Sequence, residues 1–295
     1  MSITIVQCYF PLSDFQGFGA YLASTLFLHY YCLQKKYKLI NSYEFHSAFK
    51  NSFFSNPLPG IKPNTTETIP IIHTFDELED YIASQSSSVI YISFYGGTTD
   101  ILFNRTKYLE SIDFIKSQCL NVSDTLTKKI NTLFETILMS KQQYIAVHLR
   151  VGDEDLVQNE GIYKPLYNCF LKNIENLILP LLENDKIIII SDNITLKKIL
   201  KTNYAHPNLY IMETIPKHTG IQTHIEDSCI DDTLVDFFIL AYSKQILIVS
   251  AQHQHPIVSS FFSRYCGCIY NIPTKIKKIQ LEIFNNKTSY QVKNS

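Results

Sequence analysis

Arginine is scarce in this chain of 295 residues, and neither sign of charge is in excess. Only three arginines occur, Arg105, Arg150 and Arg264, and 26 basic residues stand against 27 acidic ones, for a formal net charge of -1. A balanced charge produces no long-range field toward a nucleic acid or an anionic membrane, so we expect neither as a partner. Any phosphate must be held by a local group, which makes each arginine a stronger candidate than usual.

Long apolar runs are also missing. No uninterrupted apolar run reaches the roughly 18 to 20 residues that a membrane span needs. The opening residues, MSITIVQCYF, carry no cationic segment and no cleavage site, and they predict a strand rather than a signal peptide. Seven cysteines, an odd number at irregular spacing, are typical of free thiols in a reducing compartment. We therefore expect a cytoplasmic protein without a membrane span.

Strand-like and helix-like stretches alternate along the chain, which favours an α/β fold. A strand near residues 3–10, a turn-rich loop and a helix over 20–35 form the opening unit of a Rossmann-like domain. A second α/β series begins with a strand at 144–150. Unbroken apolar runs such as IIIIS at 187–191 suit parallel strands that are covered on both faces.

This pattern predicts three regions. They are an N-terminal Rossmann-like domain at 1–140, a C-terminal Rossmann-like domain at 141–275 and a polar C-terminal tail at 276–295. In parallel sheets the loops that leave the carboxyl ends of the strands form the ligand crevice, so polar residues at those ends are the functional candidates.

The sharpest polar cluster is YIAVHLRVGDED, in which a buried strand leads to His148, Arg150, Gly152 and Asp153. Alternation along a strand puts His148 and Arg150 on the same side. A planar guanidinium suits bidentate phosphate binding, and the neighbouring glycine lets the backbone approach a ligand closely. The alternative from spacing alone is a structural ion pair between Arg150 and Asp153.

Two further strands end in polar residues. KIIIISDN ends at Asp192 and Asn193, and QILIVS ends at Ser250, shortly before His253. Asp236 lies within an apolar helix, where a carboxylate needs a specific partner. The DED at 153–155 formally satisfies a metal-binding Asp-x-Asp pattern, but that pattern is short and common.

The ordered set of motifs resembles the fucosyltransferase superfamily, which spans alpha-1,2 and alpha-1,6 fucosyltransferases and protein O-fucosyltransferases. HLRVGD resembles its HxRxGD signature, and KIIIISDNITLKKIL is similar to its second motif. DDTLVDFFILAYSKQILIVS is similar to the third motif, and FQGFGAYLASTLFLHYYCLQKKYKL to the glycine-rich first loop with its long helix. The resemblance implies an α/β fold of the GT-B-like kind, with two Rossmann-like domains facing a central cleft and the acceptor on the N-terminal side.

The resemblance also implies roles for individual residues. Arg150 would bind the diphosphate of GDP-fucose and stabilise the charge on the leaving GDP. Asp192 would lie near the base or ribose, and a helix starting near Pro256 would direct its positive end at the phosphates. The implied residues that bind the sugar nucleotide are Gly17, Gly19, His148, Arg150, Gly152, Asp192, Asp236, Ser250 and His253.

The catalytic base is less well defined. An inverting transferase needs a carboxylate or histidine within reach of the acceptor hydroxyl. Four acids lie in the loop after Arg150, and of these we favour Asp153 or Glu160 as the catalytic base. The predicted activity is inverting transfer of fucose from GDP-fucose to a hydroxyl of a glycan or protein, with no cofactor and no metal. The alternatives are another nucleotide sugar as donor, or an inactive module that binds a nucleotide or glycan.

Overall fold

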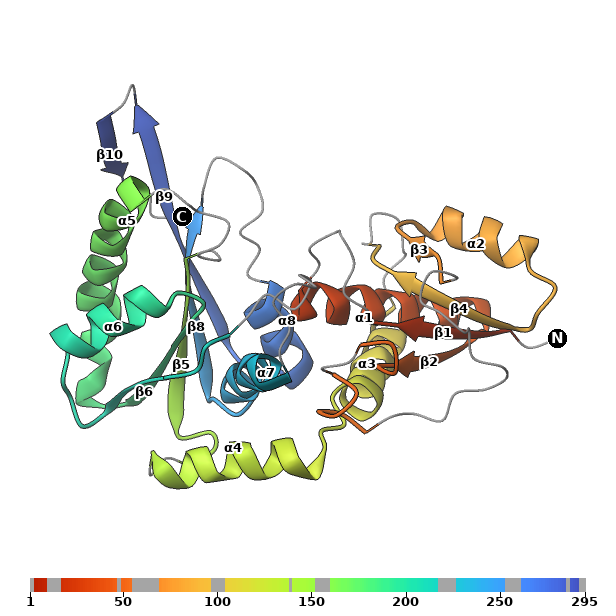
Figure 1. Ribbon diagram of the computed structural model, residues 1–295, viewed down its shortest axis with the longest axis horizontal. Helices are drawn as coiled ribbons and strands as arrows, with labels where there is room; N and C mark the ends of the chain where they lie inside the picture. Colours follow the sequence, from red (N-terminus) through yellow and green to blue (C-terminus); the bar gives the residue numbers. More distant parts are fainter. Residues whose placement is uncertain are drawn as a thin grey trace. The chain divides into compact units, whose positions relative to one another are not determined.

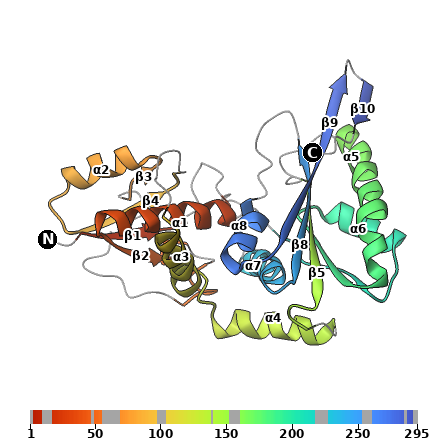
Figure 2. The same ribbon diagram turned by 180° about the vertical axis from the view of Figure 1, so that it is seen from behind.

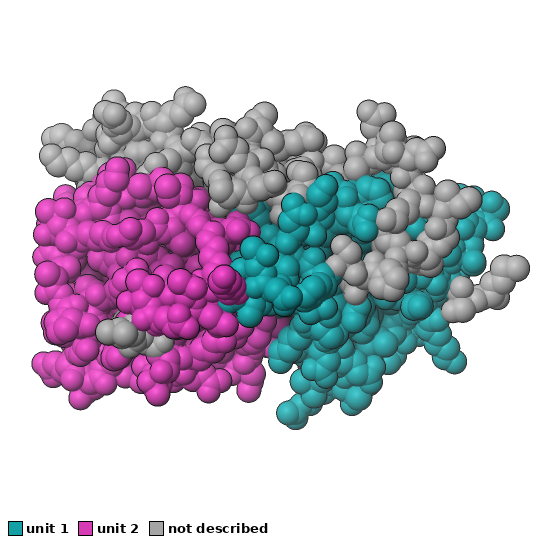
Figure 3. Space-filling view, turned by 60° about the horizontal axis from the view of Figure 1, so that its bottom comes forward, with its two compact units in different colours: residues 1–127, 218–230 teal, residues 128–217, 231–295 magenta. Residues whose placement is uncertain are grey.

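The protein forms two compact units in a computed structural model, residues 1–127 with 218–230 and residues 128–217 with 231–295 (Figure 3). The structure describes residues 3–9, 17–46, 49–54, 69–96, 104–137, 140–151, 160–216, 227–252, 261–284 and 287–291. Among these residues no helix is long and apolar enough to cross a membrane.

The first unit contains a four-stranded parallel sheet with the strand order β2-β1-β4-β3 (Figure 1). Its elements are β1 (Thr4–Cys8), α1 (Phe18–Lys35), β2 (Lys38–Ser42), β3 (Ile71–Ile72), α2 (Phe75–Ser84), β4 (Val89–Phe94), α3 (Arg105–Phe114) and the π-helical turn η2 (Ile115–Cys119). Gln7 joins the two central strands, because its Nε2 donates to the carbonyl of Phe94 at 3.0 Å and its Oε1 accepts from the Phe94 amide at 2.9 Å.

The second unit contains a six-stranded sheet with the order β10-β9-β8-β5-β6-β7, parallel except for β10. Its elements are α4 (Asp124–Thr136), β5 (Tyr144–Arg150), α5 (Glu160–Asn173), the π-helical turn η4 (Ile174–Ile178), the 3-10 helix η5 (Leu179–Glu183), β6 (Lys186–Ser191), α6 (Ile194–Asn203), β7 (Leu209–Ile211), α7 (Asp227–Ala241), β8 (Gln245–Gln252), α8 (Phe261–Tyr270), β9 (Thr274–Phe284) and β10 (Lys287–Gln291). Helices α4 and α7 each begin within the residues of the first unit.

The strand order places a topological switch point between β5 and β8. The chain runs outward from β5 to β6 and β7, and then returns to the opposite side of β5 with β8 and β9. Such a reversal sends the crossing helices to opposite faces of the sheet, and it opens a crevice at the carboxyl ends of the two strands where the order reverses. The site is therefore expected where β5 and β8 end.

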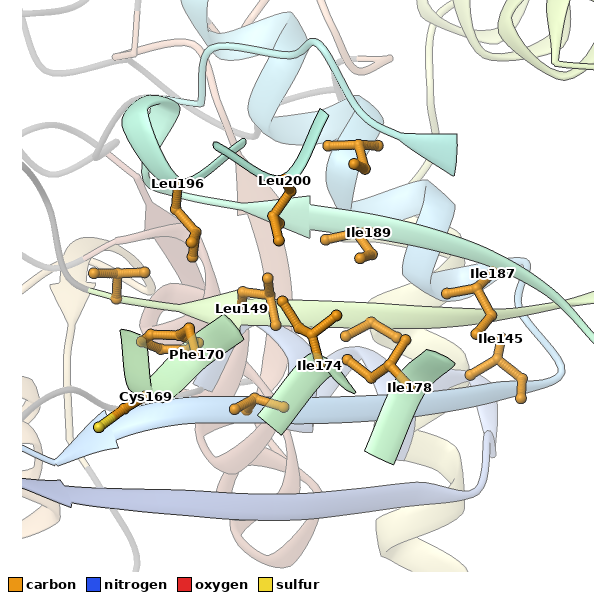
Figure 4. Packing of buried hydrophobic residues seen from close by; sticks show 14 of the residues in the cluster. Ile145, Leu149, Cys169, Phe170, Ile174, Ile178, Ile187, Ile189, Leu196 and Leu200 are labelled. Atoms are coloured by element: carbon orange, nitrogen blue, oxygen red, sulfur yellow. The ribbon is translucent and has the colours of Figure 1, made fainter. Parts of the chain in front are cut away.

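The two faces of this sheet are covered by different helices. Ile145 and Leu149 of β5 pack against Phe170 of α5 and Ile174 of η4 in one buried cluster (Figure 4). On the other face, the Tyr144 hydroxyl donates to a backbone carbonyl of α7. Figures 1 and 2 show α5 and α6 on one side of the strands and α7 and α8 on the other. Both faces are covered, as the apolar strand sequences predict.

The α/β fold with two Rossmann-like units is confirmed, but the predicted tail is wrong. Residues 276–295 contribute most of β9 and all of β10 rather than a tail outside the sheet. Apolar and polar residues alternate over 279–283, which is the signal of a strand near a sheet edge, and this part of β9 pairs mainly with β10. The helix predicted from Pro256 begins at Phe261 in the described part of the chain.

Candidate functional site

The structure brings His148, Arg150, Asp192 and Ser250 to the carboxyl ends of neighbouring strands. Arg150 of β5 and Ser250 of β8 are register partners across the switch point. Asp192 directly follows β6, the strand on the other side of β5. Leu149 of β5 and Ser191, the last residue of β6, are also register partners, so β5 and β6 end within one residue of each other, while β8 continues to Gln252.

The side chains of His148 and Arg150 lie on the face of α7 and α8. This follows from alternation, because Val147 and Leu149 of the same strand belong to the apolar cluster on the opposite face. Ser250 is on the same face for the same reason, since Val249 belongs to that cluster. The prediction that His148 and Arg150 share a side is confirmed.

Asp192 holds Arg150 and the backbone beside it. The Arg150 Nη1 donates to the Asp192 Oδ2, and the amide of Val151 donates to the Oδ1 of the same carboxylate at 3.0 Å. The Arg150 side chain keeps 19% of its surface exposed, against 9% for Asp192. The guanidinium is thus fixed in direction by a carboxylate behind it and is still accessible to a ligand.

This pair differs from the ion pair considered from the sequence. Asp153, the predicted partner of Arg150, lies outside the described residues, and Asp192 comes from the next strand, 42 residues along the chain. The placement of Asp192 near a base or ribose stays a prediction. Its observed contacts show what it does within the protein, which is to orient Arg150 and the chain leaving β5.

His148 contacts Ser263, a residue of α8 that the sequence did not single out. The His148 Nδ1 and the Ser263 Oγ are joined by a hydrogen bond, and the two residues are 6% and 0% exposed. Burial lowers the pKa of His148 to about 4, so the ring is neutral at neutral pH. Because Ser263 is fully buried, its hydroxyl cannot reach a substrate as a nucleophile, so only the histidine of this pair is placed to meet a ligand.

Asp236 belongs to a buried polar cluster with Thr214 and Lys197. The Thr214 hydroxyl donates to the Asp236 Oδ1 at 2.8 Å, and the Lys197 Nζ donates to the Thr214 carbonyl and lies 3.3 Å from its Oγ1. Asp236 is 3% exposed and Lys197 4%. Burial raises the pKa of Asp236 to about 7 and lowers that of Lys197, while each charge favours the charged form of the other. The specific partner expected for Asp236 is therefore present.

Of the other predicted site residues, the structure locates some and does not describe the rest. Gly17 and Gly19 lie at the start of α1 in the first unit, and the Gly17 backbone is in an ordinary extended conformation with φ of -74°. Glu160 is the first residue of α5, and its side chain is not described. Gly152, Asp153 and His253 lie outside the described residues. The roles of these residues stay predictions.

Three residues of the site region were missed from the sequence: Lys197, Thr214 and Ser263. Lys197 is on the same face of α6 as Leu196 and Leu200, so helical spacing could have distinguished this buried lysine from the exposed Lys198. Thr214 and Ser263 are ordinary hydroxyl residues outside any motif. A second signal was Asp236, because a carboxylate among apolar helix positions requires partners elsewhere in the chain.

A metal site is not formed by the described part of the chain, where no three His, Cys, Asp or Glu side chains are grouped. The DED sequence at 153–155 and the segment 218–226 with its two histidines lie outside the described residues. The side chains that are described offer one guanidinium, one neutral imidazole and hydroxyl groups at the switch point. This set suits a phosphate-bearing ligand.

Comparison with known proteins identifies the fold. No protein-family model matches the chain, and no curated protein matches its sequence. The alpha-1,6-fucosyltransferase NodZ, co-crystallized with GDP, matches with a TM-score of 0.52 and 14% identity over 98% of each chain. Fucosyltransferase NodZ from Bradyrhizobium matches with a TM-score of 0.51 and 14% identity over 98% of this chain and 97% of its own.

A plant enzyme has the same architecture. A mutant of FUT1 from Arabidopsis thaliana, in complex with GDP, matches with a TM-score of 0.52 and 12% identity over 97% of this chain and 72% of its own. Likeness at such low identity concerns the fold. The chain has the GT-B-like α/β fold of these structures, which confirms the expected fold class.

Proposed function

We propose that the protein is a glycosyltransferase that transfers fucose from GDP-fucose to a hydroxyl group of a glycan or protein acceptor. The observation that carries the proposal is Arg150, which the Asp192 carboxylate orients at the switch point while leaving it partly exposed. Sugar nucleotides bind at such points in α/β sheets, and a guanidinium there matches a diphosphate.

The structural neighbours support this donor. NodZ and FUT1 were solved with GDP, and NodZ also after soaking with GDP-fucose. The three sequence motifs fall on β5, on β6 with α6, and on α7 with β8, and the carboxyl ends of these three parallel strands lie at the same edge of the sheet. Three motifs that are separate in the sequence thus contribute neighbouring strands, in the order β8-β5-β6, which favours a sugar nucleotide over an unrelated ligand.

The chemistry follows from the charge that develops on the leaving group. When the bond between fucose and the diphosphate breaks, negative charge grows on the diphosphate oxygens, and a guanidinium already held in place stabilises it without reorganisation. Inversion requires a base that takes the proton of the acceptor hydroxyl, and Asp153 or Glu160 is the proposed group. The proposal needs no metal ion, because Arg150 provides the positive charge.

A nucleotide screen tests the donor. We expect GDP at about 100 times its dissociation constant to raise the Tm by about 5 °C or more, because a ligand of the native state adds about 2.7 kcal/mol of stability at that concentration. UDP and CDP should give less than half of this shift at equal concentration, and EDTA should leave the GDP shift unchanged.

The other outcomes are equally informative. A larger shift with UDP or CDP would replace GDP-fucose by another donor, and a shift that needs Mn²⁺ or Mg²⁺ would assign a metal to the DED sequence. GDP binding without release of GDP from GDP-fucose, across a panel of glycan and protein acceptors, would identify a binding module instead of an enzyme.

Substitution of Asp192 tests how Arg150 is held. We expect Asp192→Asn to weaken GDP binding about tenfold, because an amide loses the charge-assisted bond to the guanidinium, for which about 1.5 to 3 kcal/mol is typical. Isothermal titration with GDP measures the effect. The matched control is Asp185→Asn, at the opposite end of β6, where the aspartate pairs with Lys244 near the surface. Equal affinity in both variants would contradict the role of Asp192.

A further inference from the structure

The hydrogen bond between Ser263 and His148 connects the start of α8 to the strand that carries Arg150. Ser263 is fully buried, and among the described residues its hydroxyl has one hydrogen-bond partner, the Nδ1 of His148. His148 is two residues before Arg150 on the same face of β5. Its ring also lies near Phe262, with the ring centroids 6.1 Å apart. The orientation of the imidazole is therefore set from within the fold.

The burial of this pair decides which nitrogen carries the proton. At neutral pH the ring is neutral, with one N–H donor and one acceptor nitrogen. If the Nδ1 carried the hydrogen, it would donate to Ser263, and the Ser263 hydroxyl hydrogen would have no acceptor among the described groups. A buried donor without an acceptor is strongly unfavourable. If Ser263 donates to the Nδ1, both groups are satisfied and the Nε2 carries the hydrogen.

We propose that Ser263 is a positioning residue that donates to the His148 Nδ1 and holds the ring in the Nε2–H tautomer, so that His148 donates to a diphosphate oxygen beside Arg150. The opposite tautomer would turn a lone pair toward an anion, which is repulsive. The tautomer follows from the contacts of Ser263 alone, whereas the ligand rests on the proposed function.

Nuclear magnetic resonance of the ring nitrogens tests the tautomer directly. In protein labelled with ¹⁵N-histidine, two-bond ¹H–¹⁵N spectra distinguish a protonated ring nitrogen from an unprotonated one, and His148→Gln assigns the signals by their loss. We expect wild-type His148 to be protonated at the Nε2, with the same pattern in Ser263→Thr and a mixture of tautomers in Ser263→Ala. A wild-type ring protonated at the Nδ1, or a pattern unchanged in Ser263→Ala, overturns the proposal.

Titration with GDP tests the consequence for binding. We expect Ser263→Ala to bind GDP about tenfold more weakly and Ser263→Thr to stay within about twofold of the wild type, since only threonine keeps the hydroxyl donor. The matched control is Ser243→Ala, which removes another buried hydroxyl, bonded to the carbonyl of Leu240 at 2.8 Å, and should not change GDP affinity.

The spectra and the GDP titration distinguish a failure of the tautomer assignment from a failure of the proposed function. Absence of GDP binding in the wild type would remove the proposed function and the diphosphate partner of His148, while the tautomer would still be decided by the spectra. Normal GDP affinity in Ser263→Ala, together with a changed tautomer, would show that His148 does not contact the ligand. Because the wild-type spectrum is itself decisive, a Ser263→Ala protein that fails to fold does not prevent the test.

Discussion

Arg150→Lys is expected to lower the release of GDP from GDP-fucose by at least about 100-fold, with a Tm close to that of the wild type. Removing one preorganised donor to a developing anion typically lowers kcat by about two to three orders of magnitude. Lysine keeps the positive charge beside Asp192, but its single ammonium cannot reach the carboxylate and a phosphate with the planar fork of a guanidinium. Steady-state assays of nucleotide release, with a thermal scan of each protein, measure both quantities.

The control for this substitution is Arg105→Lys, the same chemical change at the exposed first residue of α3 in the other unit. It should leave the rate of GDP release and GDP affinity unchanged. Wild-type turnover by Arg150→Lys would refute the assignment of Arg150 to the diphosphate. Loss of activity accompanied by a large fall in Tm would instead point to a structural role of the ion pair with Asp192.

Lys197→Met is expected to lower the free energy of unfolding by about 3 to 5 kcal/mol at pH 8, because it leaves the buried Asp236 carboxylate without its nearby cation. The folded-state pKa of Asp236 is raised to about 7, so the stability linked to this group is present at low pH and is lost as the pH rises through 7. Without Lys197 that pKa rises further. The defect should therefore be largest above pH 7 and smaller at pH 5, where the carboxyl is protonated.

Urea denaturation at pH 5 and pH 8 measures this difference. The double substitution Lys197→Met with Asp236→Asn should recover at least half of the loss at pH 8, since no uncompensated charge remains. Lys201→Met is the matched control, one turn along the same helix, where the lysine pairs with Glu213 and the two side chains are 41% and 76% exposed. Such a surface pair contributes about 0 to 1 kcal/mol. Equal losses in the two single variants would exclude the buried cluster as their cause.

The parts of the fold that could be predicted are those with a local signal. The unbroken apolar run of β6 and the alternation along β5 indicate parallel strands and place His148 and Arg150 on one face, and the structure agrees. The strand β9 and the edge strand β10 were missed, because polar residues dilute the apolar signal and because β9 is a strand through its pairing with β8 on one side and with β10 on the other.

The partners of the site residues could not be predicted, because they depend on how distant segments pack. Arg150 could have paired with Asp153, three residues away, but the described contact is with Asp192 from the neighbouring strand. Strand order alone brings the ends of β5 and β6 together, and strand order is a property of the whole sheet. The same holds for Lys197 and Thr214, whose shared cluster forms only when α7 brings Asp236 to them.

The amino-acid sequence by itself determined the α/β alternation, the two Rossmann-like halves and the presence of polar groups at strand ends. These features depend on periodicity and composition, which are local properties and do not depend on how the elements pack. The tertiary structure decided which of these groups meet. Ser263 reaches His148 across 115 residues, and Asp192 reaches Arg150 across 42. Contacts between residues so far apart in the sequence arise from packing and burial. They therefore cannot be predicted from any short stretch of the chain.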